Sequence, residues 1–223
     1  CCGFSSPANF SKAFQAYFGF TPSEHRNATP GIDSKNGKLF SKYGKEIHPA
    51  LTYNGTLSEQ QSEVVKSKIK RIEVVNLPET HFCTIASSKG YQPDGIFEAW
   101  AMMREWLARH NIALEKSKSV AFCFDNIWLT PQEMCRYESA YAVDDSAWAK
   151  KMGMCIRTQE AGRYLLIEYC GKMHDIQQLY LWILSDYLAN THLIPAYQYV
   201  IERDINVDHD TNTFHLEVLI KVH

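Results

Sequence analysis

The carboxylates that stand in apolar, strand-like runs are the residues of this chain best suited to bind a small molecule. In the stretch TFHLEVLIKV, residues 213–222, alternate positions are apolar, so Glu217 and Leu219 fall on the other face of the expected strand. Glu168 stands in a similar run, RYLLIEYC. A partly buried carboxylate gains affinity only where a cation offsets its desolvation. Glu217 and Glu168 are therefore candidates to meet a cationic group, and a solvated strand glutamate is the alternative at Glu217.

Aromatic side chains are dense in the same part of the chain. Most of them are expected in the core, because aromatic rings dominate core burial. Tyrosine shifts this expectation toward binding, since a buried phenol needs a hydrogen-bond partner and is common in ligand pockets. The aromatic candidates for a ligand site are Trp100, Tyr137, Tyr164, Trp182 and Tyr197.

A second set of polar residues, near the start of the chain, points to DNA. PANFSKAFQAYF, residues 7–18, is expected to be a helix, with Ser6 as its N-cap and Gly19 just past its end. Asparagine or glutamine on such a helix can read adenine, while serine and lysine suit phosphates. A solvated helix face is the alternative. The candidate DNA contacts, which lie off the apolar face, are Ser5, Ser6, Asn9, Lys12 and Gln15.

The chain lacks the short motifs that carry common enzyme chemistry. GxSxG, HExxH and a phosphate-binding loop are all missing from the sequence. The nine histidines are dispersed, and the DHD triplet at 208–210 is expected in a hairpin turn rather than at a metal site. We therefore expect no catalytic residues, no metal and no cofactor.

Composition and charge place the two candidate activities in different parts of the chain. With 223 residues, 45% of them hydrophobic, and no apolar run of membrane-spanning length, a globular protein without a membrane partner is expected. The seven cysteines, without a CxxC pair, are read as reduced thiols of a cytoplasmic protein. Residues 1–70 carry a net charge of +4 and residues 71–223 one of −6. Only the front of the chain is therefore expected to meet nucleic acid.

Strand and helix patterns alternate from residue 69 onward in an order that occurs twice. Two ββαββ-like units side by side predict an α+β fold with a mainly antiparallel sheet and two helices, preceded by a partial helix-turn-helix. The long helices are expected in DGIFEAWAMMREWLARHNI and DIQQLYLWILSDYLANT, each with one apolar face. The expected domains are a half helix-turn-helix at 1–26, a linker at 27–65, and an effector domain at 66–223.

The opening residues CGFSSPANFSKAFQAYFGFTP resemble the second helix-turn-helix of the AraC/XylS family of transcription regulators. The resemblance covers the recognition helix and the closing Gly-Phe-Thr-Pro. It implies that the first helix-turn-helix of such a regulator would precede this chain. It also implies sequence-specific DNA binding in the parent protein and only weak binding by this fragment, since few phosphates could be engaged.

The remaining chain resembles the gyrase-inhibitor-like effector-binding domain that follows the DNA-binding part of some of these regulators. The matching stretches are CRYESAYAV, GRYLLIEYCGKMHDI and HLEVLIKV. The resemblance implies a ligand cleft between two pseudo-symmetric halves, with an aromatic cage and carboxylates for lipophilic cations. In relatives the glutamate matching Glu217 faces the cleft. Relatives often carry a glutamate where PAYQYV places Gln198. Because glutamine has no charge, this departure would weaken the preference for a strong cation.

Together these features predict a transcription regulator whose C-terminal domain binds a small effector and so modulates DNA binding. A stand-alone module that sequesters a drug-like compound is the alternative, and a small hydrolase of the same fold is a further one. The expected partners are a small-molecule effector and DNA.

Overall fold

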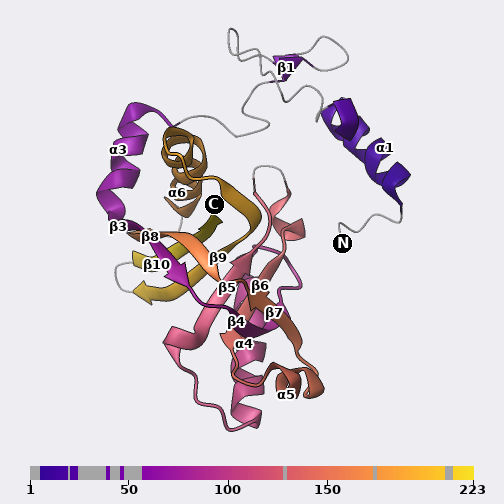
Figure 1. Ribbon diagram of the computed structural model, residues 1–223, viewed down its shortest axis with the longest axis vertical. Helices are drawn as coiled ribbons and strands as arrows, with labels where there is room; N and C mark the ends of the chain where they lie inside the picture. Colours follow the sequence, from indigo (N-terminus) through magenta and orange to yellow (C-terminus); the bar gives the residue numbers. More distant parts are fainter. Residues whose placement is uncertain are drawn as a thin grey trace. The chain divides into compact units, whose positions relative to one another are not determined.

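The computed structural model describes residues 6–19, 21–24, 39–40, 46–47, 57–127, 130–172, 175–208 and 213–223. The chain forms two compact units, residues 1–55 and residues 56–223 (Figure 1). The smaller unit contains α1 (Pro7–Phe18), β1 (Leu39–Phe40) and β2 (Glu46–Ile47). The larger unit contains, in chain order, α3 (Glu59–Lys68), β3 (Ile69–Leu77), β4 (Thr80–Ala86), α4 (Pro93–Arg109), η3 (Lys116–Lys118), β5 (Ser119–Cys123), η4 (Gln132–Met134), β6 (Tyr137–Ala142), α5 (Ser146–Lys151), β7 (Cys155–Gln159), β8 (Gly162–Lys172), α6 (Ile176–Trp182), η6 (Ile183–Tyr187), η7 (Leu188–Asn190), β9 (Pro195–Asp208) and β10 (Thr213–Val222).

Helix α1 has the ends that its sequence predicts. The Ser6 hydroxyl accepts a hydrogen bond from the backbone N–H of Asn9 at 3.2 Å, which caps the first turn. Gly19 ends the helix in the left-handed conformation, with φ 80°, and its N–H donates to the carbonyl of Gln15 at 2.9 Å. On the apolar face the rings of Phe10 and Phe14 pack with their centroids 5.6 Å apart.

The sheet of the larger unit has the order β3-β8-β10-β9-β5-β6-β4-β7, and every pairing between its described strands is antiparallel. Two ββαββ repeats build it, as the sequence predicts: β3 to β6 around α4, and β7 to β10 around α6. The repeats exchange their first strands. Edge strand β3 of the first repeat pairs with β8 of the second, and β7 of the second pairs with β4 of the first.

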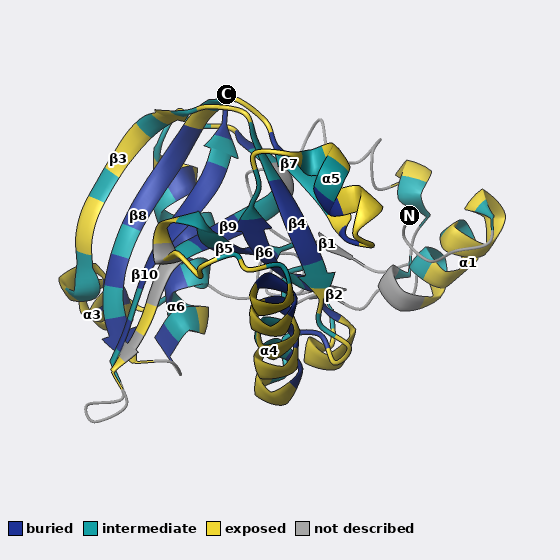
Figure 2. Cartoon of the chain, turned by 90° about the horizontal axis from the view of Figure 1, so that it is seen from below, coloured by how far each residue is buried: buried dark blue, intermediate teal, exposed yellow. Residues whose placement is uncertain are grey.

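Apolar clusters lie on both faces of this sheet. On one face, α6 covers a cluster that includes Ile167 and Val218, and α4 covers another that includes Tyr141 (Figure 2). The opposite face carries a third cluster, which includes Phe122 and Leu219. Successive residues of a central strand point to opposite faces, and here both faces carry apolar residues. The sequences of β8 and β10 are therefore almost continuously hydrophobic.

Helix α3 belongs to the larger unit. Ser58 and Gln61 form a reciprocal capping box at its start. Val65 is buried in the cluster under α6, and the Ser62 hydroxyl donates to the Asp186 carboxylate at 2.6 Å. The domain boundary expected near residue 65 falls inside this helix. None of the helices in the described part of the chain is long and apolar enough to cross a membrane.

Two glycines with positive φ offer a test of close backbone packing. A Cβ on Gly90, φ 61°, would lie 2.3 Å from the carbonyl oxygen of Gln132, whereas a Cβ on Gly153, φ 87°, would meet nothing within 4 Å. Both alanine variants incur backbone strain of about 1–2 kcal/mol, but only Gly90→Ala adds a clash with rigid backbone. We expect Gly90→Ala to lower the free energy of unfolding in urea by at least about 2 kcal/mol more than Gly153→Ala. Equal losses would contradict the close approach.

Candidate functional site

Strand register places Glu202 at the centre of the sheet, on the face that carries the two long helices. Val218 pairs with both Ile167 and Glu202, and Ala121 pairs with both Glu202 and Ser139. These residues form one row across the sheet on a single face. The row begins beneath α6 and ends beneath α4, where the Ser139 hydroxyl donates to the carbonyl of Ala99 at 3.1 Å. Glu202 lies at the seam where the repeats join through β9 and β5.

The carboxyl group of Glu202 is buried against polar side chains from both repeats. Glu202 as a whole residue is only 8% exposed. The Tyr180 hydroxyl, from α6, donates to Oε1 at 2.5 Å, and the Cys123 thiol, from β5, also donates to the carboxyl. Burial raises the pKa of Glu202 above its ordinary value, and these hydrogen bonds offset only part of that effect. The protonated form is therefore favoured more strongly than in a solvated glutamate.

Aromatic side chains of the first repeat surround the same seam. The indole Nε1 of Trp100, on α4, donates to the hydroxyl of Tyr137, on β6, at 2.8 Å. The ring of Tyr91 meets Tyr137 edge to face, with centroids 6.3 Å apart. Burial raises the pKa of Tyr137, and nearby Cys123 and Glu202 raise it further, so its phenol stays neutral. This arrangement offers flat apolar surface beside one titratable carboxyl, the combination suited to an amphipathic guest.

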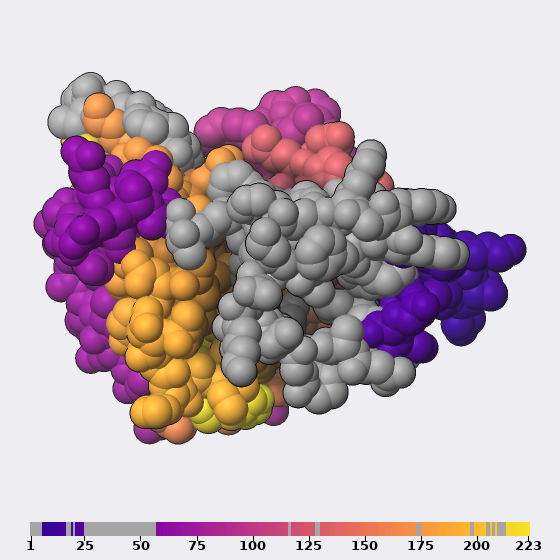
Figure 3. All heavy atoms as spheres, turned by 90° about the horizontal axis from the view of Figure 1, so that it is seen from above, coloured from indigo at the N-terminus to yellow at the C-terminus, as the bar shows by residue number. Residues whose placement is uncertain are grey.

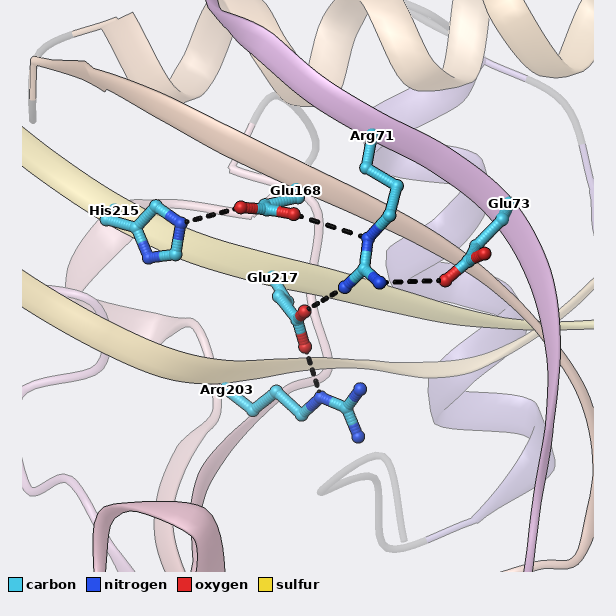
Figure 4. Close-up of polar contacts among 6 residues, drawn as sticks. All are labelled: Arg71, Glu73, Glu168, Arg203, His215 and Glu217. Carbon is cyan, nitrogen blue, oxygen red and sulfur yellow. Dashed lines mark hydrogen bonds and ion pairs between the residues drawn. The ribbon is translucent and has the colours of Figure 1, made fainter.

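The expected carboxylates Glu217 and Glu168 lie on the opposite face of the sheet, within a network of charges (Figure 4). Arg71 donates to Glu217 Oε1 at 2.7 Å, and Arg203 donates to Glu217 Oε2 at 2.5 Å. Glu168 pairs with Arg71 at 3.2 Å and lies 3.1 Å from Nε2 of His215. The alternation predicted for β10 is thus present. The side chain of Glu217 is 8% exposed and is paired with two arginines, so the alternative of a solvated strand glutamate does not apply.

The other predicted ligand residues are divided in the same way. Tyr164 and Leu219 are buried in the cluster on the face opposite the helices, where the Tyr164 hydroxyl donates to the carbonyl of Glu160 at 2.8 Å. Trp182 is buried under α6 on the helix face. Tyr197 and Gln198 belong to β9, but their side chains lie outside the described part of the structure. Of the predicted set, the structure brings together Trp100 with Tyr137 on the helix face, and Glu168 with Glu217 and Tyr164 with Leu219 on the opposite face.

Sequence reasoning missed Glu202, Tyr180, Tyr91 and Cys123. The signal for Glu202 was weak, because in YVIERD it shares strand parity with the apolar Val200 but also with the acidic Asp204. Tyr180 falls on the apolar stripe of α6 and reads as a core residue. Only the pairing of β9 with β5 reveals that Cys123, from the first repeat, reaches the same carboxyl.

Among the predicted DNA-binding residues, Ser6, Asn9, Lys12 and Gln15 are on or beside α1, and Ser5 lies outside the described residues. Asn9 and Lys12 are exposed, while Gln15 is half-buried. The hydroxyl of Ser6 is engaged in capping the helix. In the described part of the chain, no group of three acidic, histidine or cysteine side chains is placed to hold a metal ion, and the triplet at 208–210 lies mostly outside that part.

Comparison with known proteins assigns the two parts of the chain separately. A family model for the GyrI-like small molecule binding domain matches residues 70–223. A model for bacterial regulatory helix-turn-helix proteins of the AraC family matches residues 1–27. Comparison with the curated proteins gave no match.

Several solved structures are similar to this chain at low sequence identity. The chain is similar to EcmrR in a cryo-EM complex with DNA, at 10% identity and a TM-score of 0.56, over 99% of this chain and 85% of that one. It is also similar to SAV2435 bound to tetraphenylphosphonium, at 14% identity and a TM-score of 0.47, over 69% and 94% of the two chains. A third similar structure is a hydrolase from Listeria innocua, at 9% identity and a TM-score of 0.46, over 74% and 98%.

The ion pairs of Arg71 offer a test of the network on the face away from the helices. Glu217→Gln leaves two guanidinium groups without their buried carboxylate, and we expect a loss of about 2 kcal/mol, below the range for fully buried pairs because both arginines are partly exposed. Glu73 also pairs with Arg71, at 3.1 Å, but is 43% exposed. Glu73→Gln should cost less than about 0.5 kcal/mol. Urea unfolding of both variants measures the difference, and similar losses would contradict a buried role for Glu217.

Proposed function

Because this chain belongs to the GyrI-like family of small molecule binding domains, we propose that the polar cluster around Glu202 is where it binds its effector. The observation that carries this assignment is a single carboxyl buried at the seam of the two repeats, with side chains from both repeats around it. A ligand at this point touches α4 and α6 at once. The proposed ligand has a flat apolar body and a basic or hydrogen-bonding head, and the head takes the place of the Tyr180 hydroxyl on Glu202.

The match to the AraC-type helix-turn-helix supports a regulatory role for ligand binding. Ligand affinity controls DNA binding only where the ligand binds the DNA-competent and DNA-incompetent states with different affinities. We propose that α1 contacts DNA through Asn9, Lys12 and Gln15, with Ser5 and Ser6 at its start. The small-molecule site then acts as the sensor of a transcription regulator.

Hydrolysis of the bound molecule is the second candidate function. A carboxyl with a raised pKa, such as Glu202, is suited to give a proton to a leaving group. One of the similar structures is described as a hydrolase. Incubation with an activated aryl ester separates the two: consumption of many equivalents supports an enzyme, whereas stoichiometric binding without consumption supports the sensor.

Titration with tetraphenylphosphonium, a lipophilic cation, tests the site. We expect calorimetry to show saturable binding to the native chain. Glu202→Gln, which keeps the shape but loses the charge, should weaken it by at least about tenfold. Glu217→Gln, on the opposite face, serves as the matched control and should change the affinity less than about twofold. Binding lost in Glu217→Gln but kept in Glu202→Gln would transfer the site to the other face.

The affinity for this cation should depend on pH through Glu202. The cation prefers the ionised carboxylate, and the raised pKa keeps part of the population protonated above the ordinary value of 4.5. Affinity should therefore rise as the pH increases from 4.5, by at most about tenfold per pH unit, and level off once the carboxyl is ionised. Calorimetry over a pH series measures this. The Glu202→Gln variant should show a flat profile, and a native profile equally flat would rule out Glu202 as the group that meets the cation.

A further inference from the structure

A groove on the larger unit lies between the start of β3 and the far end of α6. Its volume is about 470 Å³. Tyr180 faces Glu202, and Trp182 follows two positions later on the same helix, roughly 200° around its axis, so α6 separates this groove from the cluster at the seam. The lining residues are Lys66, Ile69, Lys70, Arg71, Ile72, Trp182 and Tyr187.

A β-bulge in the edge strand shapes one wall of the groove. Ile69 pairs with Tyr169 and Arg71 pairs with the adjacent residue, Glu168, so Lys70 is an extra residue with no partner of its own on β8. Bulges turn side chains away from the alternation of a regular strand and are frequent beside functional sites. Here the bulge lets Ile69 and Ile72, which are three positions apart, pack on the same cluster beneath α6.

A π-helical turn shapes the other wall. The turn spans Ile183–Tyr187 and directly follows α6. In a π-helix residues five apart are brought into line, so Trp182 and Tyr187 stack side by side, with ring centroids 5.3 Å apart at 39°. Such turns are rare and frequently found at functional sites. The groove therefore has an aromatic wall whose alignment depends on an uncommon backbone.

The indole N–H of Trp182 is a buried donor without a hydrogen-bond acceptor among the described residues. Trp182 is 3% exposed, and within the described part of the structure its Nε1 has no hydrogen-bond partner. Buried polar groups are almost always hydrogen-bonded, and an orphan donor lowers stability. An acceptor atom brought by a guest in the groove, after a small opening of the wall, would satisfy it.

The charged residues that line the groove are all cations, in a unit that is otherwise acidic. Four of the six residues from Lys66 to Arg71 are cations, although residues 71–223 carry a net charge of −6. Arg71 is held by carboxylates, and Lys66 pairs with Glu63 at 2.9 Å. Lys70 forms no ion pair with the described residues, so its ammonium is available to an anion (Figure 3 shows the purple edge formed by α3 and β3).

We propose that this groove is a second small-molecule site, which takes an amphipathic anion with a flat aromatic body and a carboxylate or sulfonate group. The body lies against Tyr187, Ile69 and Ile72, and the anionic group meets Lys70. An acceptor atom receives the indole N–H of Trp182 once the wall has opened. This site prefers an anion, whereas the site at Glu202 prefers a cation. The proposal for this groove does not depend on the proposal for Glu202.

The fluorescent anion 8-anilinonaphthalene-1-sulfonate tests the proposal on the whole chain. We expect saturable binding at one site. Lys70→Glu should weaken it about tenfold, because the variant places a like charge against the sulfonate. Lys150→Glu, an equal change at an exposed lysine of α5, is the matched control and should leave the affinity within about twofold. Equal affinities of the two variants would overturn the assignment to this groove.

Two further measurements separate this groove from the seam. Trp182→Phe keeps an aromatic ring but removes the indole donor, and we expect about threefold weaker binding of the sulfonate. Saturating tetraphenylphosphonium should leave the sulfonate bound, and Glu202→Gln should leave its affinity unchanged. Displacement by the cation, or loss in Glu202→Gln, would place the anion at the seam and overturn the second site. If tetraphenylphosphonium did not bind to the chain at all, the proposed site at Glu202 would be contradicted and the proposed anion site would not.

Discussion

A carboxyl group held out of water at the junction of two repeats is the constraint on which the rest of the structure depends. Removing an ionised carboxylate from water costs several kcal/mol in a protein interior. Glu202 reduces this cost by protonation and by hydrogen bonds from Tyr180 and Cys123, which come from different repeats. Both repeats must therefore be correctly joined for this group to be tolerated. Because these partners are neutral, a cation that reached Glu202 would form a new electrostatic attraction to its carboxylate.

The two buried glutamates of the sheet show how the same side chain supports two different roles. Glu217 has a guanidinium on each oxygen and ties the edge strand β3 to the central strands. In the described part of the structure, Glu202 is hydrogen-bonded to neutral partners, Tyr180 and Cys123. A fully paired carboxylate has little to offer a guest, whereas a neutral-paired one can exchange a hydroxyl for a cation. Charge balance, more than burial, distinguishes the structural acid from the candidate binding acid.

Much of this fold could be predicted from the sequence, because its determinants are local. The caps of α1, the alternation in β10 and the ββαββ order all follow from short-range pattern. The side chains that meet at Glu202 could not be predicted in this way, because their proximity depends on the pairing of β5 with β9 across the two repeats. Glu217 was singled out by strand parity and by the family resemblance, and neither can show that Arg71 and Arg203 occupy the same face.

The exchanged edge strands carry a consequence for how such a fold could be divided. A single repeat on its own would lack the strand that the other repeat lends to its border, and a second copy could supply it by a reciprocal swap. Two identical halves would then form a twofold dimer with the same sheet, in which every seam contact occurs twice. Joining both halves in one polypeptide removes that symmetry, so one side of the seam can carry the acid while the other carries the rings.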